Sequence, residues 1–216
     1  MLSRLAASCI GIAAFAATLG GAWALFRFQG GDEPPTREAL VGAARFTLPS
    51  GYFRPRSRGG GRLERLELAA FFPDFTPAGA ASDIDGKTDL AERYRKLVFI
   101  EIRPADSDLD PAERPAKLYA RFLEPERSSH PGGLVAAAFQ AGSPFEGEAL
   151  YFVAPEGRVF AARCGRPDGA QKTPRACAYD FRTGDIDVEL RFSPALLADW
   201  EKLNAGARGL IAAARR

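Results

Sequence analysis

The sequence predicts an α+β domain that follows an N-terminal transmembrane helix. Three observations support this fold class. Residues 5–26 are uncharged and mainly apolar, strand-like runs separated by compact turns fill residues 134–192, and an amphipathic helix follows Ser193. The amphipathic helix needs an apolar surface on which to pack. We therefore expect a two-layer domain, mainly antiparallel sheet, with the C-terminal helix across one face.

The apolar segment 5–26 has two interpretations. Its length matches the roughly 20 residues that cross a bilayer, and Arg4 and Arg27 flank it. Ala22-Trp23-Ala24 also has the small-x-small pattern of a signal peptidase site, which would release a domain near Ala24. The apolar run exceeds the usual signal-peptide core, so we predict an uncleaved anchor. Ala6-Ala7-Ser8-Cys9 resembles the end of a lipoprotein signal, but the apolar core follows Cys9 instead of preceding it, and lipidation is not expected.

The chain divides into three predicted parts. Residues 1–28 form the anchor or signal. Residues 29–42 form a tether, because the first ten of them are mainly polar and show no apolar periodicity. Residues 43–216 are long enough for one domain with its own core.

The predicted elements follow from alternation and capping signals. Leu66, Leu68, Ala70 and Phe72 alternate along one face of a strand, and Asp110-Pro111 begins a helix because Asp caps free amides and Pro fits the first turn. The strand-like segments between residues 134 and 192 predict a β-meander with turns at 155–157 and 183–185. The expected strands are 44–48, 63–72, 96–103, 134–140, 148–153, 159–164, 176–181 and 186–192, and the expected internal helix is 110–123.

The last element is the clearest helix. Ser193 supplies a cap and Pro194 the first turn, and apolar residues then recur at helical spacing. The apolar stripe consists of Leu196, Leu197, Trp200, Leu203, Ala207, Leu210 and Ile211.

Two cysteines lie outside the anchor. Cys164 and Cys177 close a short polar loop between two predicted strands, which is typical of a disulfide that staples a hairpin in an oxidising compartment. Flanking positive charges do not decide the orientation of the anchor. The cysteines favour a bacterial inner-membrane protein whose C-terminal domain lies in the periplasm, or a periplasmic protein if cleavage occurs.

The charge of the chain is nearly balanced, at +2, so we expect no nucleic-acid partner. The positive charge is nevertheless concentrated around the glycines 59–61. A flexible loop of this kind could bind an anionic polymer or an envelope protein, or it could be only a solvated hairpin loop. The residues of this candidate site are Arg54, Arg56, Arg58, Arg62 and Arg65.

No catalytic, cofactor or metal site is predicted. Residues 81–92 partly follow a calcium-loop pattern, but Ala81 stands where the first ligand belongs. His130 is the only histidine, and the GxSxG elbow of many serine hydrolases is absent. Asp185, Asp187 and Glu189 alternate on the predicted solvent face of one strand, as they would on any half-exposed strand, so they do not indicate a glycosidase pair.

Two stretches carry a resemblance to known proteins. The run from Phe46 through Phe75 and the run from Cys164 through Cys177 to Trp200 resemble a group of uncharacterised, single-anchor envelope proteins of proteobacteria. This resemblance implies a layout but no activity. The order of strands and helix is also similar to the PsbP and Mog1-like α+β fold, which likewise does not determine function.

These observations favour a binding function. We expect a membrane-anchored periplasmic domain with a binding or envelope-assembly role, held to the membrane by its N-terminal helix. One alternative is a hydrolase that acts on envelope material. Another is a protective inhibitor of a secreted toxin.

Overall fold

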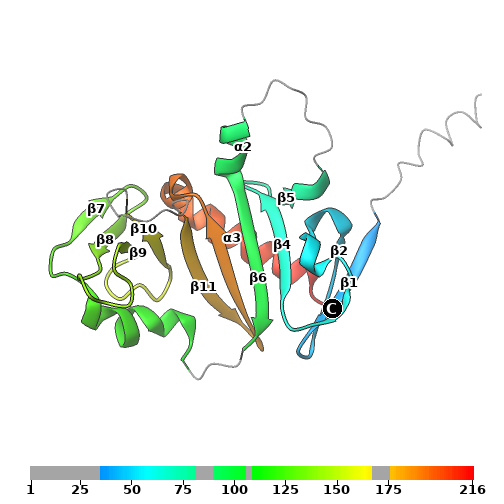
Figure 1. Ribbon diagram of the computed structural model, residues 1–216, viewed down its shortest axis with the longest axis horizontal. Coiled ribbons are helices and arrows are strands. Elements are labelled where there is room, and N and C mark those ends of the chain that lie inside the picture. Colours follow the sequence, from blue (N-terminus) through cyan, green and yellow to red (C-terminus); the bar gives the residue numbers. More distant parts are fainter. Residues whose placement is uncertain (1–34, 81–89, 106–108, 167–175) are drawn as a thin grey trace, which may run out of the picture. The chain divides into compact units, whose positions relative to one another are not determined.

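The computed structural model describes residues 35–80, 90–105, 109–166 and 176–216, and Thr36–Arg216 form one compact unit. The predicted anchor lies outside the described residues. Among the residues that are described, no helix has the length and hydropathy needed to cross a membrane. The unit is a mainly antiparallel sheet with a C-terminal helix, which confirms the predicted α+β class (Figure 1).

The main sheet has nine strands in the order β5-β4-β6-β12-β11-β10-β9-β8-β7, and every neighbouring pair is antiparallel. The predicted meander is confirmed, since β8 to β12 are neighbours in chain order. The strands are β4 (Leu66–Phe71), β5 (Thr76–Pro77), β6 (Leu97–Pro104), β7 (Ser128–His130), β8 (Leu134–Ala138), β9 (Glu148–Phe152), β10 (Ala161–Gly165), β11 (Cys177–Thr183) and β12 (Ile186–Phe192). The short helix α2 (Leu90–Lys96) precedes β6.

A second sheet changes the predicted start of the domain. Its strands β1 (Thr36–Val41), β2 (Ala44–Pro49) and β3 (Gly61–Leu63) have the order β2-β1-β3. All of β1 falls in the predicted tether 29–42, so the folded part begins before residue 43. The first residues of β1 are polar and exposed, and only Ala39 and Val41 are buried, so the strand has too few apolar positions to show alternation. Gly42 forms the turn to β2 with a φ of +58°.

The predicted helix 110–123 is instead a series of three short helical turns. These are η4 (Pro111–Glu113), η5 (Pro115–Tyr119) and η6 (Ala120–Phe122). The predicted cap is present, because Ala112 N donates to Asp110 Oδ1 at 2.9 Å. Pro115 has no N–H to donate to the carbonyl four residues earlier, which prevents a continuous α-helix.

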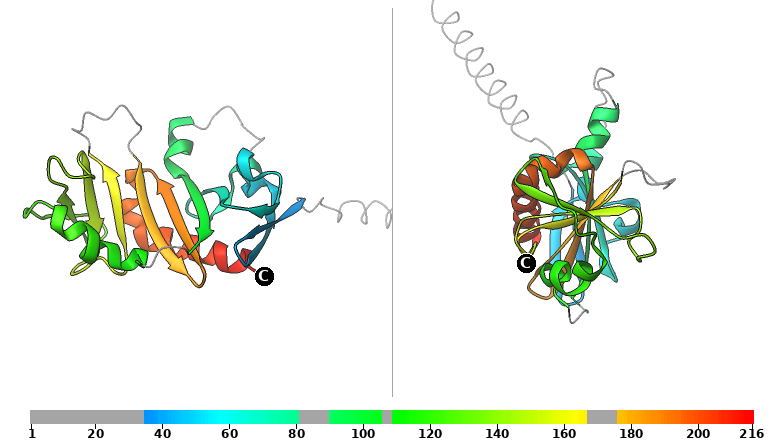
Figure 2. Two further views of the ribbon diagram at one scale, coloured as in Figure 1. Left: turned by 60° about the horizontal axis from the view of Figure 1, so that its bottom comes forward. Right: turned by 90° about the vertical axis from the view of Figure 1, so that its left-hand side faces the viewer.

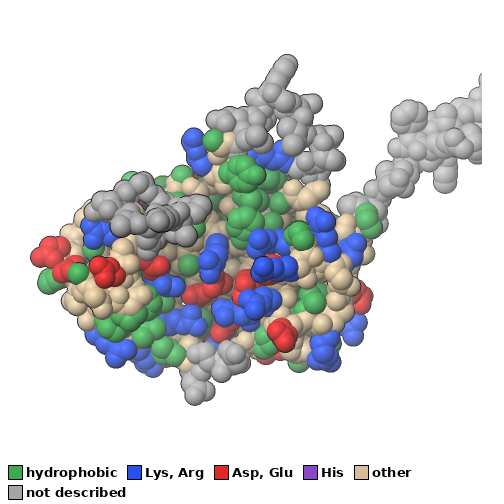
Figure 3. Space-filling model, in the orientation of Figure 1, with side chains coloured by type: hydrophobic (Ala, Val, Ile, Leu, Met, Phe, Trp, Pro, Cys, Tyr) green, Lys and Arg blue, Asp and Glu red, His purple; other side chains and the backbone are tan. Residues whose placement is uncertain are grey.

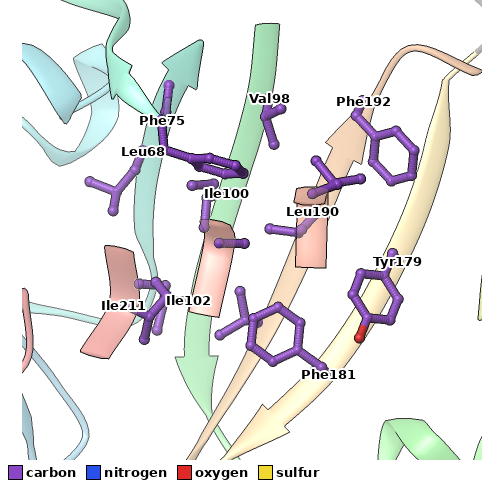
Figure 4. Packing of buried hydrophobic residues seen from close by; sticks show 14 of the residues in the cluster. Leu68, Phe75, Val98, Ile100, Ile102, Tyr179, Phe181, Leu190, Phe192 and Ile211 are labelled. Carbon is purple, nitrogen blue, oxygen red and sulfur yellow. The ribbon is translucent and has the colours of Figure 1, made fainter. Parts of the chain in front are cut away.

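The C-terminal helix covers one face of the main sheet. The turn η7 (Pro194–Asp199) leads into α3 (Trp200–Ala214), which lies against one side of the strands (Figure 2). The Ser193 hydroxyl accepts from Ala195 N at 3.3 Å, so the predicted cap is confirmed. Apolar side chains of β4, β6, β11 and β12 point towards the helix, where they meet residues such as Ile211 (Figure 4). The predicted stripe supplies Leu196, Leu197, Trp200, Leu203, Ala207 and Ile211 to this core.

A second, smaller core lies beneath the helical turns η4 to η6. Tyr119 and Leu123 pack there against Phe139, Leu150 and Phe152 of the region around β8 and β9. At β8 and β9, the helical turns therefore cover the face of the sheet that points away from α3.

The predicted disulfide is confirmed. Cys164 and Cys177 are directly opposite each other on β10 and β11, with an S–S distance of 2.05 Å. These two strands pair at only three positions. The disulfide therefore reinforces a short junction between the part of the sheet packed on α3 and the part packed on the helical turns.

Helix α3 approaches the sheet closely at Gly206. A methyl group there would lie 2.3 Å from Phe75 Cε2, whereas a methyl group at Gly209 would meet no atom within 4 Å. Phe75 is 4% exposed, so its ring has little room to move away.

The two helix glycines give a matched test of this packing. We expect Gly206→Ala to lower the free energy of unfolding by about 1–3 kcal/mol because the methyl group overpacks the core. Gly209→Ala should raise it by up to about 1 kcal/mol because alanine favours the helix. Urea unfolding measures both, and equal effects of the two substitutions would contradict the close contact with Phe75.

Removing the disulfide should also destabilise the domain. The bond spans a sequence separation of 13 residues, and the loss of such a cross-link costs about 3 kcal/mol through loop-closure entropy. We expect this loss in urea unfolding of the Cys164→Ser/Cys177→Ser variant. Reductant should shift the wild-type protein in the same direction and leave the variant unchanged, and an unshifted wild-type midpoint would contradict the prediction.

Candidate functional site: the charged face of the main sheet

Four carboxylates form a row across four neighbouring strands. Glu67 of β4 lies opposite Glu101 of β6, which lies opposite Glu189 of β12, which lies opposite Asp180 of β11. These residues alternate with the buried apolar residues, so they share the face that points away from α3. Like charges directly opposite each other destabilise a sheet, so this row requires compensating cations.

Arginines provide that compensation at every position of the row. Arg103 connects two of the carboxylates, with Nε 3.4 Å from Glu101 Oε1 and Nη2 3.8 Å from Glu189 Oε2. Beside the row, Arg182 donates from Nε and Nη2 to the two oxygens of Asp187 at 2.6 and 2.9 Å. Among the described residues, the pairs on this face are Arg54–Glu67, Arg56–Glu67, Arg65–Glu101, Arg103–Glu101, Arg103–Glu189, Arg191–Glu189, Arg114–Asp180 and Arg182–Asp187. We call this set the charged face.

The backbone holds Arg54 and Arg56 beside β4. Phe53 forms an isolated bridge with Leu68, and Arg54 N donates to Glu67 O at 3.0 Å. Glu67 N in turn donates to the Ser57 hydroxyl at 2.8 Å. The segment that follows β2 thereby extends the edge of the main sheet, and both guanidinium groups stand within 4 Å of the buried Glu67 carboxylate.

Over β4, β6 and β12, the cations of the charged face are more exposed than the carboxylates beneath them. The side chains of Glu67 and Glu189 are 7% and 17% exposed, whereas those of Arg56 and Arg191 are 86% and 66% exposed. Figure 3 shows Lys and Arg side chains around and over the acidic ones in the centre of this face. A molecule that approaches the face therefore meets guanidinium groups first.

The covered part of the same face limits the accessible area. Arg163 of β10 lies opposite Ala178 of β11, so its side chain is on the same face of the sheet as that of Asp180. The guanidinium group of Arg163 is, however, 5.0 Å from the ring centroid of Phe145, which packs against the smaller core. The accessible charged face thus extends over β4, β6, β12 and β11. At its β11 end is a hollow of about 140 Å³ lined by Asp180, Arg182 and Arg158 among others.

The carboxyl group of Asp180 has a raised pKa. Burial raises its pKa above the usual value of 3.8, although the positive charge of Arg114, 2.9 Å away, acts to lower it. Because a buried carboxylate is poorly solvated, its ionisation costs folding free energy that the ion pair with Arg114 partly offsets.

The five predicted arginines separate into two groups. Arg54, Arg56 and Arg65 lie on the charged face, and their binding role stays a prediction. Arg58 and Arg62 do not: Arg62 lies on β3 of the small sheet, and the backbone oxygen of Arg58 accepts from Arg37. Both side chains are exposed and, within the described part of the chain, neither pairs with a carboxylate.

Sequence reasoning missed the remaining arginines of the charged face. Asp187 and Glu189 lie, as predicted, on the face opposite the buried apolar residues of their strand, but Asp187 is itself buried beside Arg182 and not exposed to solvent. The same alternation in β6 and β11 marks Arg103 and Arg182 as outward-facing, but it does not indicate that they meet.

The other sequence candidates do not form a site in the described regions. Most of the calcium-like segment 81–92 lies outside the described residues, and no group of three metal-ligating side chains occurs among those that are described. His130 is on the edge strand β7, and its ring packs edge-on against Tyr151 at 4.9 Å. Asp185 pairs with Arg215.

Comparison with known proteins identifies the fold but no family. No protein-family model and no curated protein match the chain. A solved structure of Smlt3025, an immunity protein of the Stenotrophomonas maltophilia type IV secretion system, has a TM-score of 0.57 at 16% identity, covering 85% of this chain and 94% of that one. The Neisseria meningitidis iron-regulated outer membrane lipoprotein FrpD has a TM-score of 0.45 at 11% identity, covering 82% and 92%. The fold is thus shared with the immunity protein, and neither structure supports the expected likeness to PsbP and Mog1-like proteins.

The ion pair of Asp180 makes a testable electrostatic prediction. The folded-state pKa of Asp180 should exceed that of a free aspartate, and Arg114→Gln should raise it further by removing the nearby positive charge. Carboxyl NMR titration measures both pKa values. Because the folded form binds the proton more tightly than the unfolded form, this carboxyl should lower the free energy of unfolding as pH rises from the unfolded to the folded pKa. A pKa below 3.8, or one unaffected by Arg114→Gln, would contradict this account.

Proposed function

We propose that this protein is a protective inhibitor that binds a secreted toxin through the charged face of its main sheet. The observation that carries this proposal is the layering of the face, with exposed arginines above half-buried carboxylates. The ion pairs hold the arginines in place before a partner arrives. Such pre-organisation reduces the entropy lost on binding.

The composition of the face favours recognition of a protein. Arginine and aromatic residues are enriched in protein interfaces, and on this face the Arg54 guanidinium lies 4.6 Å from the centre of the Phe99 ring. Each carboxylate of the row already has a guanidinium partner. Such paired charges can contact a complementary protein surface, and this binding needs no catalytic step.

The shared fold supports the choice of a toxin as the partner. Smlt3025 is described as an immunity protein of a type IV secretion system, and its likeness covers 94% of that chain. At 16% identity the likeness concerns the fold, so the inhibitory role is part of our proposal.

The proposed location agrees with this role. We infer that residues 1–28 anchor the chain in the inner membrane and that the domain lies in the periplasm, where oxidising conditions sustain the Cys164–Cys177 disulfide. An inhibitor held there would meet a toxin as it arrives from a neighbouring cell.

A competition experiment tests the proposal. A strain that lacks this protein is grown alone and in contact with wild-type siblings whose secretion system is active. We expect normal growth alone and loss of viability in contact, with rescue by the intact gene and no loss when the siblings' secretion system is disabled.

The other outcomes would overturn the inhibitor proposal. A growth or envelope defect in the strain grown alone would indicate the envelope-assembly role. Equal survival beside siblings with an active and with a disabled secretion system would show that a secreted toxin is not the partner. Rescue by substoichiometric amounts of protein, with turnover of envelope material, would indicate the hydrolase.

A further inference from the structure

Three arginines of the charged face point to an acidic protein surface as the ligand. We propose that Arg56, Arg65 and Arg191 are the contact residues and that they bind carboxylates of the partner. This inference rests on the proposed function and specifies the partner chemistry of the same face.

These three side chains are the most exposed cations of the charged face. Arg56, Arg65 and Arg191 are 86%, 55% and 66% exposed, compared with 19% for Arg114 and 21% for Arg182. The less exposed arginines serve the sheet itself. Arg191 Nε donates to Glu189, whereas Arg56 and Arg65 lie 3.8 Å from their carboxylates. A guanidinium group has five N–H donors, so all three retain donors for a carboxylate of the partner.

The three contacts are distributed across neighbouring strands. Arg56 pairs with Glu67 of β4, Arg65 pairs with Glu101 of β6, and Arg191 belongs to β12. Neighbouring strands are about 4.8 Å apart, so the guanidinium groups cover a width of roughly 10 Å. Carboxylates on one helix or strand pair of a partner protein can match this spacing.

The underlying carboxylates disfavour a surface of closely spaced phosphate groups. The face combines the arginines 54, 56, 65, 103, 114, 182 and 191 with the carboxylates of Glu67, Glu101, Asp180, Asp187 and Glu189. The cations therefore exceed the anions by only two. A dense phosphate surface would be repelled by the acidic row, whereas a protein surface can place its carboxylates over the exposed arginines alone.

Aromatic side chains next to the charged face fit the same kind of partner. Arg54 lies over the Phe99 ring, and Arg93 lies 4.9 Å from the Phe71 ring centroid. Figure 3 shows hydrophobic side chains beside the charged area, near the start of β6. An apolar area bordered by cations is a common arrangement in protein interfaces.

The test uses a neutral triple variant and a matched control. The variant Arg56→Gln/Arg65→Gln/Arg191→Gln removes the proposed contacts, and Arg58→Gln/Arg62→Gln/Arg121→Gln removes the same charge from exposed arginines elsewhere. Glutamine keeps hydrogen-bonding capacity beside Glu67 and avoids the added repulsion of a glutamate. Circular dichroism and urea unfolding verify that each variant is folded.

The probes are polyglutamate and vesicles containing phosphatidylglycerol, each titrated with full-length protein in nanodiscs at low and high salt. We expect the wild type to bind polyglutamate in a salt-dependent manner and the contact variant to bind roughly tenfold more weakly. The control should bind within about twofold of the wild type. Equal loss in both variants would overturn the assignment, and stronger binding to the vesicles than to polyglutamate would indicate a membrane surface instead.

The competition experiment separates this inference from the proposed function. If the wild-type gene protects and the contact variant protects equally, the assignment of Arg56, Arg65 and Arg191 is wrong while the inhibitor function stands. If the wild type fails to protect but the contact variant selectively loses polyglutamate binding, the inhibitor function is wrong and the acid-binding surface stands.

Discussion

The structure depends on the alternation of apolar and charged residues along β4, β6, β11 and β12. The apolar positions face α3, and their burial provides the main stabilisation of the domain. The charged positions are consequently all directed to the opposite face, where their registers bring four carboxylates into one row. One pattern thus creates both the core and the electrostatic problem that the arginines solve.

In the proposed function, the arginines that solve this problem also form the binding surface. Individual surface ion pairs contribute little to stability, but a connected set limits the movement of the long arginine side chains. Arg103 joins Glu101 to Glu189 and so connects two strands of the row. A partner would meet cations that are already positioned, and the same contacts that offset repulsion within the sheet would favour its capture.

The sequence predicted local features well where neighbouring residues determine them. The strand Ile186–Phe192, the caps at Asp110 and Ser193, and the Cys164–Cys177 disulfide agree with the structure. The prediction of one helix over 110–123 was wrong because Pro115 lacks a backbone N–H donor. Strand β1 was not predicted because its composition is largely polar, and it forms through pairing with β2. In both cases backbone hydrogen bonding decided the conformation more strongly than side-chain periodicity.

Local sequence is enough to indicate which side chains of each strand face outward, because the two-residue period of a strand depends only on neighbouring residues. It also located a concentration of arginine at residues 54–65. Which charges meet depends on contacts between strands that are far apart in the chain. Strand β6 lies between β4 and β12, and the register of these strands places Glu67, Glu101 and Glu189 side by side. For the same reason only Arg54, Arg56 and Arg65 of the predicted loop reach that row, while the backbone directs Arg58 and Arg62 elsewhere.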